Sequence, residues 1–75
     1  MKKKLFFNKV KKLFQYKKVI NEETRFSDIE FDSLKLLELI AFNDSNFKSL
    51  KLSGDQINKC KNFGQLVKLY GKNIS

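Results

Sequence analysis

The sequence has no proline, no histidine and no tryptophan, and only three glycines and one cysteine among its 75 residues. Because proline is absent and glycine is rare, few positions interrupt a helix, and helical structure is favoured. The absence of histidine counts against Ser-His or Cys-His nucleophilic catalysis. The single cysteine, Cys60, cannot form an internal disulfide. This fits a reducing compartment, and we expect a cytoplasmic protein.

Long apolar runs are also missing, and none approaches the length needed to span a bilayer. The first residues begin like the charged region of a signal peptide, but Asn8, Lys9 and Lys11 break the apolar part at once. We therefore expect no export signal. The sequence has no cluster with metal-ligand spacing, no phosphate-cradling glycine-rich loop and no convergent acid and base residues. We predict that the chain is not an enzyme and holds no metal.

Charge is distributed unevenly along the chain, whose formal net charge is +8 at pH 7. Residues 1–18 hold eight lysines and no acid, and residues 48–75 hold six lysines against one acid. Residues 19–47 hold seven of the eight acids against two basic residues. Both ends therefore suit an anionic surface, and the middle suits a basic one. Products of AT-rich genes are also rich in Lys, Asn, Phe and Ile, which is an equally good explanation for the surface lysines.

The patterning predicts one all-α domain over residues 1–75, a small four-helix bundle with three main helices and one short helix. A long loop over residues 17–31 separates the first two helices, and the predicted helices cover residues 3–16, 33–43, 53–58 and 62–72. The first helix is amphipathic, because lysines fill much of its surface outside an apolar sector about 120° wide. That sector holds Phe6, Phe7, Val10, Leu13 and Phe14.

The second predicted helix is apolar nearly all round, so we place it at the centre of the bundle. Asp32 suits its N-cap, because a short side-chain oxygen can accept an otherwise unpaired backbone N–H. Residues 43–46 form a polar cluster that predicts a turn after this helix. The side chains expected in the core are Phe6, Val10, Leu13, Ile29, Leu37, Ile40, Phe47, Leu52, Phe63, Val67 and Tyr70.

The last two helices carry local start and stop signals. Ser53 and Gln56 have capping-box spacing, and Asn62 and Gln65 have a weaker version of it. Gly71 suits the end of the last helix. The last helix is expected to bury Phe63, Leu66, Val67, Leu69 and Tyr70, and the two loops to be anchored by Val19, Ile20, Phe26, Ile29, Phe31, Phe47, Leu50 and Leu52. Cys60 is expected to be a small core residue.

The most informative local signal is Asp32-Ser33-Leu34, which opens the apolar run of residues 34–42 after an acidic approach. The segment of residues 24–39, TRFSDIEFDSLKLLEL, resembles the phosphopantetheine-attachment region of the acyl carrier protein family. The order of helix, long loop, helix, short helix and helix is similar to that family's over essentially the whole chain. The segment FGQLV at residues 63–67 also resembles the family's final helix.

This resemblance implies that Ser33, with Asp32 and Leu34 as its motif, is the attachment residue for a 4′-phosphopantetheine arm. A phosphopantetheinyl transferase would supply the arm from coenzyme A, so the carrier itself needs no catalytic base. The arm's thiol would hold an acyl or aminoacyl group as a thioester. Acyl-activating or acyl-transferring enzymes of one pathway would be the partners, and we expect a monomer.

The resemblance also implies a partner surface beside the serine. Leu34, Glu38 and Ala41 are spaced i, i+4 and i+7 and form one stripe of the second helix. In the family such a stripe faces the partner enzymes, which implies Leu34 as an apolar contact and Glu38 as an ionic one. Asp28 adds a further carboxylate for basic partner surfaces.

The sequence departs from the family pattern in two respects. Glu30 stands two residues before Asp32, where the family commonly has Gly. The second and third helices are less acidic than is usual, since Lys35 and Asn43 dilute the second and only Asp55 remains in the third. These departures favour a specialised pathway over general fatty acid biosynthesis. A peptidyl carrier protein is a close variant of the same prediction.

Two other classes of function compete with a carrier. Residues 1–18 have the basic amphipathic character of interfacial helices, so a membrane-docking or bacteriocin-like helical protein is the main alternative. Against it, Trp is absent and the acids gather around one serine. The lysines also suit nucleic-acid phosphates, but with a single Arg and no recognition helix we expect no nucleic-acid partner.

Overall fold

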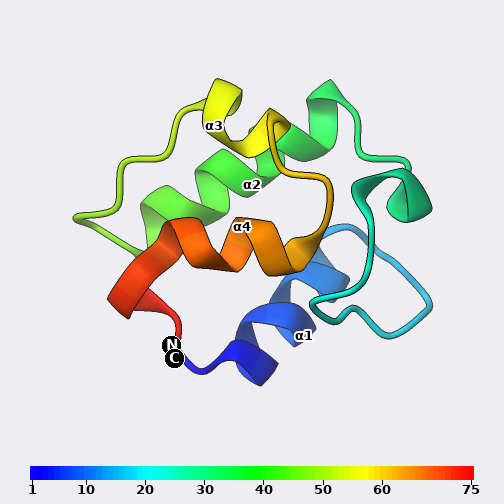
Figure 1. Ribbon diagram of the computed structural model, residues 1–75, viewed down its shortest axis with the longest axis horizontal. Coiled ribbons are helices and arrows are strands. Elements are labelled where there is room, and N and C mark those ends of the chain that lie inside the picture. The colour runs from blue at the N-terminus through cyan, green and yellow to red at the C-terminus, as the bar shows by residue number, and fades with distance from the viewer.

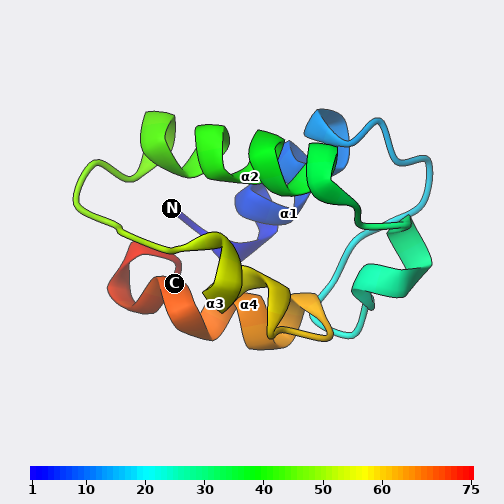
Figure 2. The ribbon, with the colours of Figure 1, turned by 90° about the horizontal axis from the view of Figure 1, so that it is seen from above.

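The computed structural model describes all of residues 1–75 and has four α-helices and no strand, which confirms the predicted all-α bundle of three main helices and one short one. The α-helices are α1 (Lys3–Leu13), α2 (Ser33–Asn46), α3 (Gly54–Asn58) and α4 (Phe63–Tyr70), and two 3-10 helices are η1 (Phe26–Ile29) and η2 (Gly71–Asn73). In Figure 1, α2 and α3 lie in the upper part of the molecule and α1 lies at the bottom. Seen from above, α1 and α2 lie on one side, and α3 and α4 lie on the other (Figure 2).

Helix α1 ends at Leu13, three residues before the predicted end. Gln15 adopts a left-handed conformation with φ 53°, which stops the helix. The amide of Tyr16 then donates to the carbonyl of Lys11 at 3.0 Å, and the amide of Gln15 to that of Lys12 at 3.2 Å. This pair of bonds is a Schellman motif with glutamine where glycine is usual, which explains why no glycine signalled the end.

The long loop between α1 and α2 is tied to the start of α4. Arg25 and Asn62 form an isolated antiparallel bridge. The amide of Phe26 donates to the carbonyl of Lys61 at 3.0 Å, and the amide of Phe63 to that of Thr24 at 3.0 Å. The predicted anchors Ile20, Phe26 and Ile29 are buried. Val19 is exposed, so the prediction that it also anchors the loop was wrong. The loop is therefore fixed against the start of α4.

Helix α2 ends at Asn46, three residues after the predicted end, so residues 43–46 are helical. We expected a turn there because Asn, Asp and Ser favour turns. In the structure Asn43 is buried in the core and Phe47 is buried just beyond the helix, so tertiary packing keeps this turn helical. Asn46 adds a side-chain bond from Nδ2 to the carbonyl of Phe42 at 2.9 Å.

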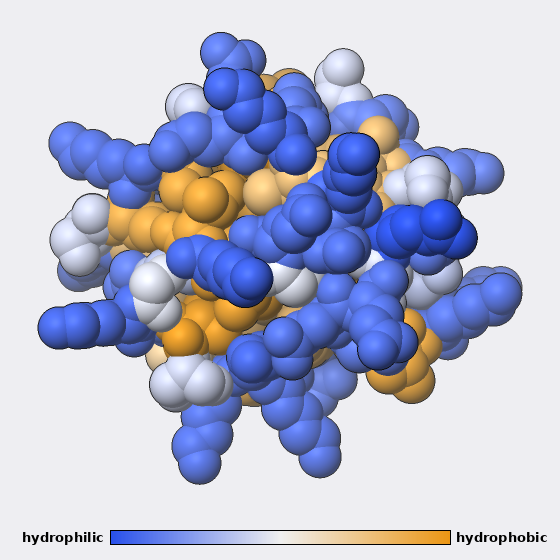
Figure 3. Space-filling model, viewed as in Figure 1, coloured by the Kyte–Doolittle hydropathy of each residue, from blue (hydrophilic) through white to orange (hydrophobic).

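The core is one cluster of buried side chains in which aromatic rings from α1, α4 and both loops pack edge to face. Of the predicted core residues, Leu13, Ile40 and Leu52 are half-buried. Leu37 and the predicted α4 core residue Leu69 are exposed, which contradicts both predictions. Polar side chains project over much of one face, with apolar patches between them (Figure 3). Helix α2 therefore covers the core with one face instead of lying at its centre.

The predicted caps are present at both later helices. Ser53 and Gln56 form a capping box, with Ser53 Oγ accepting from the Gln56 amide at 3.1 Å. Asn62 accepts from the amide of Gln65 at 2.8 Å, and Gly71 ends α4 with φ 56°. The two chain ends pair next to each other (Figure 1), since the Lys3 amide donates to the carbonyl of Ser75 at 3.0 Å.

Candidate functional site around Ser33

Asp32 caps helix α2, as the sequence predicts. Its Oδ1 accepts from the backbone amide of Lys35 at 2.9 Å, and its backbone is extended. This hydrogen bond, with the nearby Lys35 charge, lowers the pKa of the Asp32 carboxyl below its usual value. The carboxylate therefore stays ionised at neutral pH and fixes where the helix begins.

Ser33 is the first residue of α2, and its side chain is exposed. Its hydroxyl takes part in none of the hydrogen bonds within the chain, because the neighbouring Asp32 performs the capping. The first-turn amides of a helix and its dipole favour negative charge at this end. The position thus offers a free hydroxyl to an external active site and a favourable place for an attached phosphodiester.

An apolar stripe lies on the exposed surface of α2 beside Ser33. Leu34 is 66% exposed and Leu37 is 63% exposed, and Ala41 is also exposed. Their i, i+3, i+7 spacing places them on one side of the helix. We call this Leu34–Leu37–Ala41 set the α2 stripe. The sequence predicted Leu34 and Ala41 on such a stripe but assigned Leu37 to the core.

Glu38 lies at the edge of the α2 stripe and is half-buried. It takes part in neither of the two ion pairs in the structure, which join Lys3 to Glu22 and Arg25 to Asp28. Its carboxylate is therefore unpaired within the chain. Two large exposed leucines and one unpaired carboxylate together form the kind of mixed surface that a basic partner with an apolar contact would match.

Asp28, the other predicted partner contact, has a structural role in η1. Its Oδ2 accepts from the backbone amide of Arg25 at 3.0 Å, and the Arg25 guanidinium lies 3.9 Å away. The side chain is exposed but partly engaged in capping. Asp28 is therefore engaged with Arg25, whereas the carboxylate of Glu38 is unpaired.

Glu30 ends η1 in the left-handed region, with φ 52° and ψ 52°. Left-handed backbone favours glycine, since a Cβ is strained there. The turn into α2 therefore has the backbone that glycine would adopt, although glutamate occupies it. The Lys35 ammonium donates to the Glu30 carbonyl at 3.4 Å and supports this turn from the helix side.

Sequence reasoning missed a buried polar pair between α2 and α4. Asn43, which we counted in the polar turn cluster of residues 43–46, accepts a hydrogen bond at Oδ1 from the Tyr70 hydroxyl at 2.6 Å. Burial raises the pKa of that hydroxyl. No local signal in the sequence marked this pair, because the two residues lie 27 positions apart in the chain.

The remaining candidate groups are simple to place. Cys60, which we expected to be a core residue, is half-buried and packs against the edge of the core, and burial raises the pKa of its thiol. No group of three or more His, Cys, Asp or Glu side chains converges as metal ligands would. None of the helices combines the length and apolar composition that a membrane crossing requires.

Comparison with known proteins adds no relative: no family model, no curated protein and no solved structure matches this chain.

Proposed function

We propose that this chain is an acyl carrier protein whose Ser33 bears a 4′-phosphopantetheine arm. The observation that carries the proposal is the exposed, unbonded Ser33 hydroxyl at the first residue of α2, inside the motif Asp32-Ser33-Leu34. A capped helix start presents this hydroxyl outward without any support from a catalytic base. A carrier needs this arrangement, because the modifying enzyme supplies the activation.

In the modification step, the Ser33 oxygen attacks the phosphate of coenzyme A that bears the pantetheine. The bond between the two phosphates breaks, and adenosine 3′,5′-bisphosphate leaves. The hydroxyl proton passes to the transferase. The product is a phosphodiester anion at the start of α2, where the helix dipole is favourable. The arm's thiol then carries an acyl or aminoacyl group as a thioester, and its tether keeps that cargo at high effective concentration near partner enzymes.

The α2 stripe supports a docking role for the same end of the molecule. Leu34 and Leu37 are large, apolar and exposed, with the unpaired Glu38 at their side. Partner enzymes with an apolar contact inside a basic surface would match it, and electrostatic complementarity would mainly raise the rate of encounter. We infer a monomeric cytoplasmic carrier that serves one specialised pathway through such contacts.

A membrane-active helix remains the alternative function, and the packing of α1 counts against it. The apolar face of α1 contains Phe6, Phe7 and Val10, all buried in the core. This face could meet a bilayer only if α1 left the bundle. In the folded chain, the exposed side of α1 would offer a membrane chiefly its lysines, which suits a weak contact with an anionic surface and not insertion of this helix.

The proposal is tested by incubating the protein with coenzyme A, Mg²⁺ and a broad-specificity phosphopantetheinyl transferase, followed by intact mass measurement. The expected result is a gain of one arm that is absent in Ser33→Ala. A folded protein that gains no arm would contradict the proposal.

A further inference from the structure

The outward side of α1 is a row of lysines interrupted by polar and apolar side chains. Lys4, Asn8 and Lys12 are spaced i, i+4 and i+8 along the helix, and all three are exposed. Leu5 and Lys9 fill the adjacent row and are also exposed. The opposite side of the helix is buried in the core. We call these five exposed residues the α1 outer face.

The lysines of this face have no anionic partner within the chain. Residues 1–18 hold eight lysines and no acid. One of the two ion pairs in the structure uses a lysine, and it joins Lys3 to Glu22 at 3.3 Å. The ammonium groups of Lys4, Lys9 and Lys12 are therefore free to meet an external anion.

Two apolar side chains are exposed on the same surface. Leu5 is 48% exposed, and Val19, in the loop after α1, is 74% exposed. Val19 lines a hollow of about 410 Å³ together with Lys4 and Asn8, so it lies against the α1 outer face. Transfer of both apolar side chains from water into an apolar phase would be favourable. The surface therefore combines unpaired positive charge with apolar groups.

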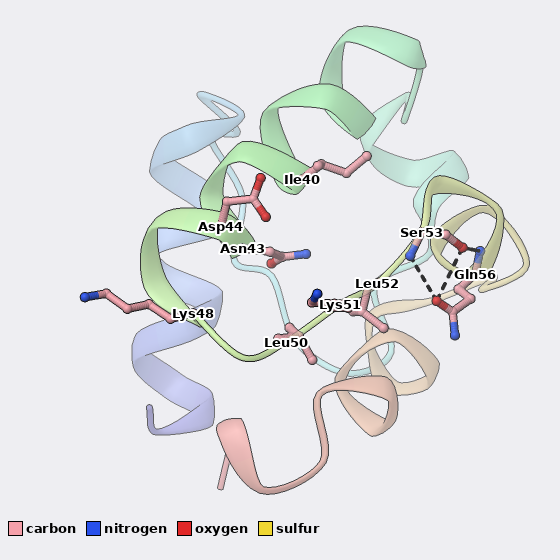
Figure 4. A pocket seen from close by; sticks show the side chains of 9 residues that line it. All are labelled: Ile40, Asn43, Asp44, Lys48, Leu50, Lys51, Leu52, Ser53 and Gln56. Atoms are coloured by element: carbon pink, nitrogen blue, oxygen red, sulfur yellow. Dashed lines mark hydrogen bonds between the residues drawn. The ribbon is translucent and has the colours of Figure 1, made fainter.

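The lysines that follow α2 do not form such a face. Lys48 and Lys51 line a hollow that Asp44 also lines (Figure 4). Opposite charges are therefore mixed there, which weakens the attraction to an anionic surface. Because Lys48 and Lys51 are exposed, they supply a matched control for the charge of the α1 outer face.

We propose that the folded chain docks on an anionic lipid bilayer through the α1 outer face, with Leu5 and Val19 entering the headgroup region. The lysines attract the anionic headgroups, and the apolar side chains between them reach the boundary of the acyl layer. The bundle stays folded, so the buried side of α1 remains in the core and the contact is peripheral and reversible. None of the residues that carry the proposed carrier function takes part.

Charge and composition favour a bilayer over other anionic partners. Nucleic acid has phosphates to match the lysines but offers no apolar layer to Leu5 and Val19. The α1 outer face also lacks arginine, the residue that most often reads bases. Lysine is depleted at protein–protein interfaces, which counts against an acidic protein. A bilayer offers a plane of negative charge with an apolar layer directly beneath it.

The test is co-sedimentation of the unmodified protein with vesicles of equal parts phosphatidylglycerol and phosphatidylcholine, and with vesicles of phosphatidylcholine alone. We expect binding to the anionic vesicles only, and its loss as salt is raised, because salt screens the attraction. Each lysine near such a surface strengthens binding by roughly fivefold, so Lys4→Gln/Lys9→Gln should weaken it by roughly 25-fold. Lys48→Gln/Lys51→Gln removes the same charge and should weaken it by less than about fivefold.

Two outcomes of this experiment would overturn the proposal. One is a failure of the wild-type protein to bind the anionic vesicles, including the case in which it binds duplex DNA instead. The other is an equal loss of binding in the two double variants, which would make the attraction a property of net charge and not of the α1 outer face. Ser33→Ala should bind the vesicles as wild type does, so failure of the carrier function would leave this result unchanged.

A second measurement tests the entry of the apolar side chains. The chain has no tryptophan, so Val19→Trp introduces a single fluorescent reporter on this surface. Asn58→Trp is the matched control, since Asn58 is exposed in α3, on the other side of the molecule from α1 (Figure 2). With anionic vesicles, the emission of Val19→Trp should move to shorter wavelength and that of Asn58→Trp should not. Binding without a shift at residue 19, or an equal shift at both positions, would overturn the proposed docking.

Discussion

The Tyr70 hydroxyl donates a 2.6 Å hydrogen bond to Oδ1 of Asn43 inside the core, so that α4 and α2 are joined by a polar contact among aromatic rings. Tyr70 contacts the rings of Phe6 and Phe47 in edge-to-face geometry. The contact accounts for a finding that the sequence did not reveal, the burial of the polar residue Asn43 in a segment where we expected a turn.

Removing the Tyr70 hydroxyl should destabilise the protein. In Tyr70→Phe the aromatic packing remains, but Oδ1 of Asn43 loses its partner. Nδ2 of Asn43 is buried and already has no hydrogen-bond partner, so the whole carboxamide would be unsatisfied. We expect a loss of about 1–2 kcal/mol in the free energy of unfolding. Urea denaturation measures this loss. In the double variant with Asn43→Leu, both polar partners are gone, and most of the loss should be recovered. Equal stability of Tyr70→Phe and wild type would contradict the role of this bond.

Replacing Glu30 by glycine should stabilise the protein. Because Glu30 is left-handed, glycine relieves strain there, and we expect a gain of about 0.5–1 kcal/mol in Glu30→Gly by thermal or urea unfolding. Glu30→Ala is the matched control, since it removes the same carboxylate but keeps a Cβ. If alanine stabilises as much as glycine, the charge and not the backbone conformation is responsible.

Leu37 and Leu39 should differ sharply in their contribution to stability. Leu37 is 63% exposed, whereas Leu39 in the same helix is 0% exposed. We expect Leu37→Ala to cost less than about 1 kcal/mol and Leu39→Ala to cost about 2–5 kcal/mol of unfolding free energy. Because Leu37 belongs to the proposed docking surface, its variant should also lower the transferase's kcat/KM. Similar losses of unfolding free energy at the two positions would indicate that Leu37 packs in the core, and would contradict this account.

The Asp32 cap should make stability depend on acidic pH. The folded-state pKa of Asp32 lies below its unfolded value of about 3.9, so its charge stabilises the fold above that pH and is lost as pH falls through the folded pKa. Asp32→Asn keeps a capping oxygen but cannot titrate. The stability advantage of wild type over this variant should be small, because the group is exposed, and should shrink below about pH 4. An advantage that does not change with pH would contradict this account.

Local sequence signals predicted the parts of the fold that depend on neighbouring residues. The caps at Asp32, Ser53 and Asn62 each need only a side-chain oxygen and an amide three residues away, and all three are present. The position of Ser33 at the start of α2 follows from the first of them. The end of α1 was missed because Gln15 adopts a conformation that its residue type rarely signals.

The faces of α2 could not be predicted in the same way. Its sequence has apolar residues in nearly every direction, so the helical period alone does not separate the buried Leu39 from the exposed Leu37. Which face of α2 is buried depends on where Phe6 of α1 and Tyr70 of α4 pack against it. The burial of Asn43 likewise depends on Tyr70, which lies 27 residues away in the chain.

The most direct test of the carrier function is the mass of the intact protein after incubation with coenzyme A, Mg²⁺ and a broad-specificity transferase. Ser45→Ala is the matched control, since Ser45 is also an exposed serine of α2. We predict that wild type and Ser45→Ala each gain one phosphopantetheine arm, and that Ser33→Ala gains none while remaining folded. Wild-type protein that stays unmodified, or an arm that persists in Ser33→Ala, would contradict the assignment of Ser33.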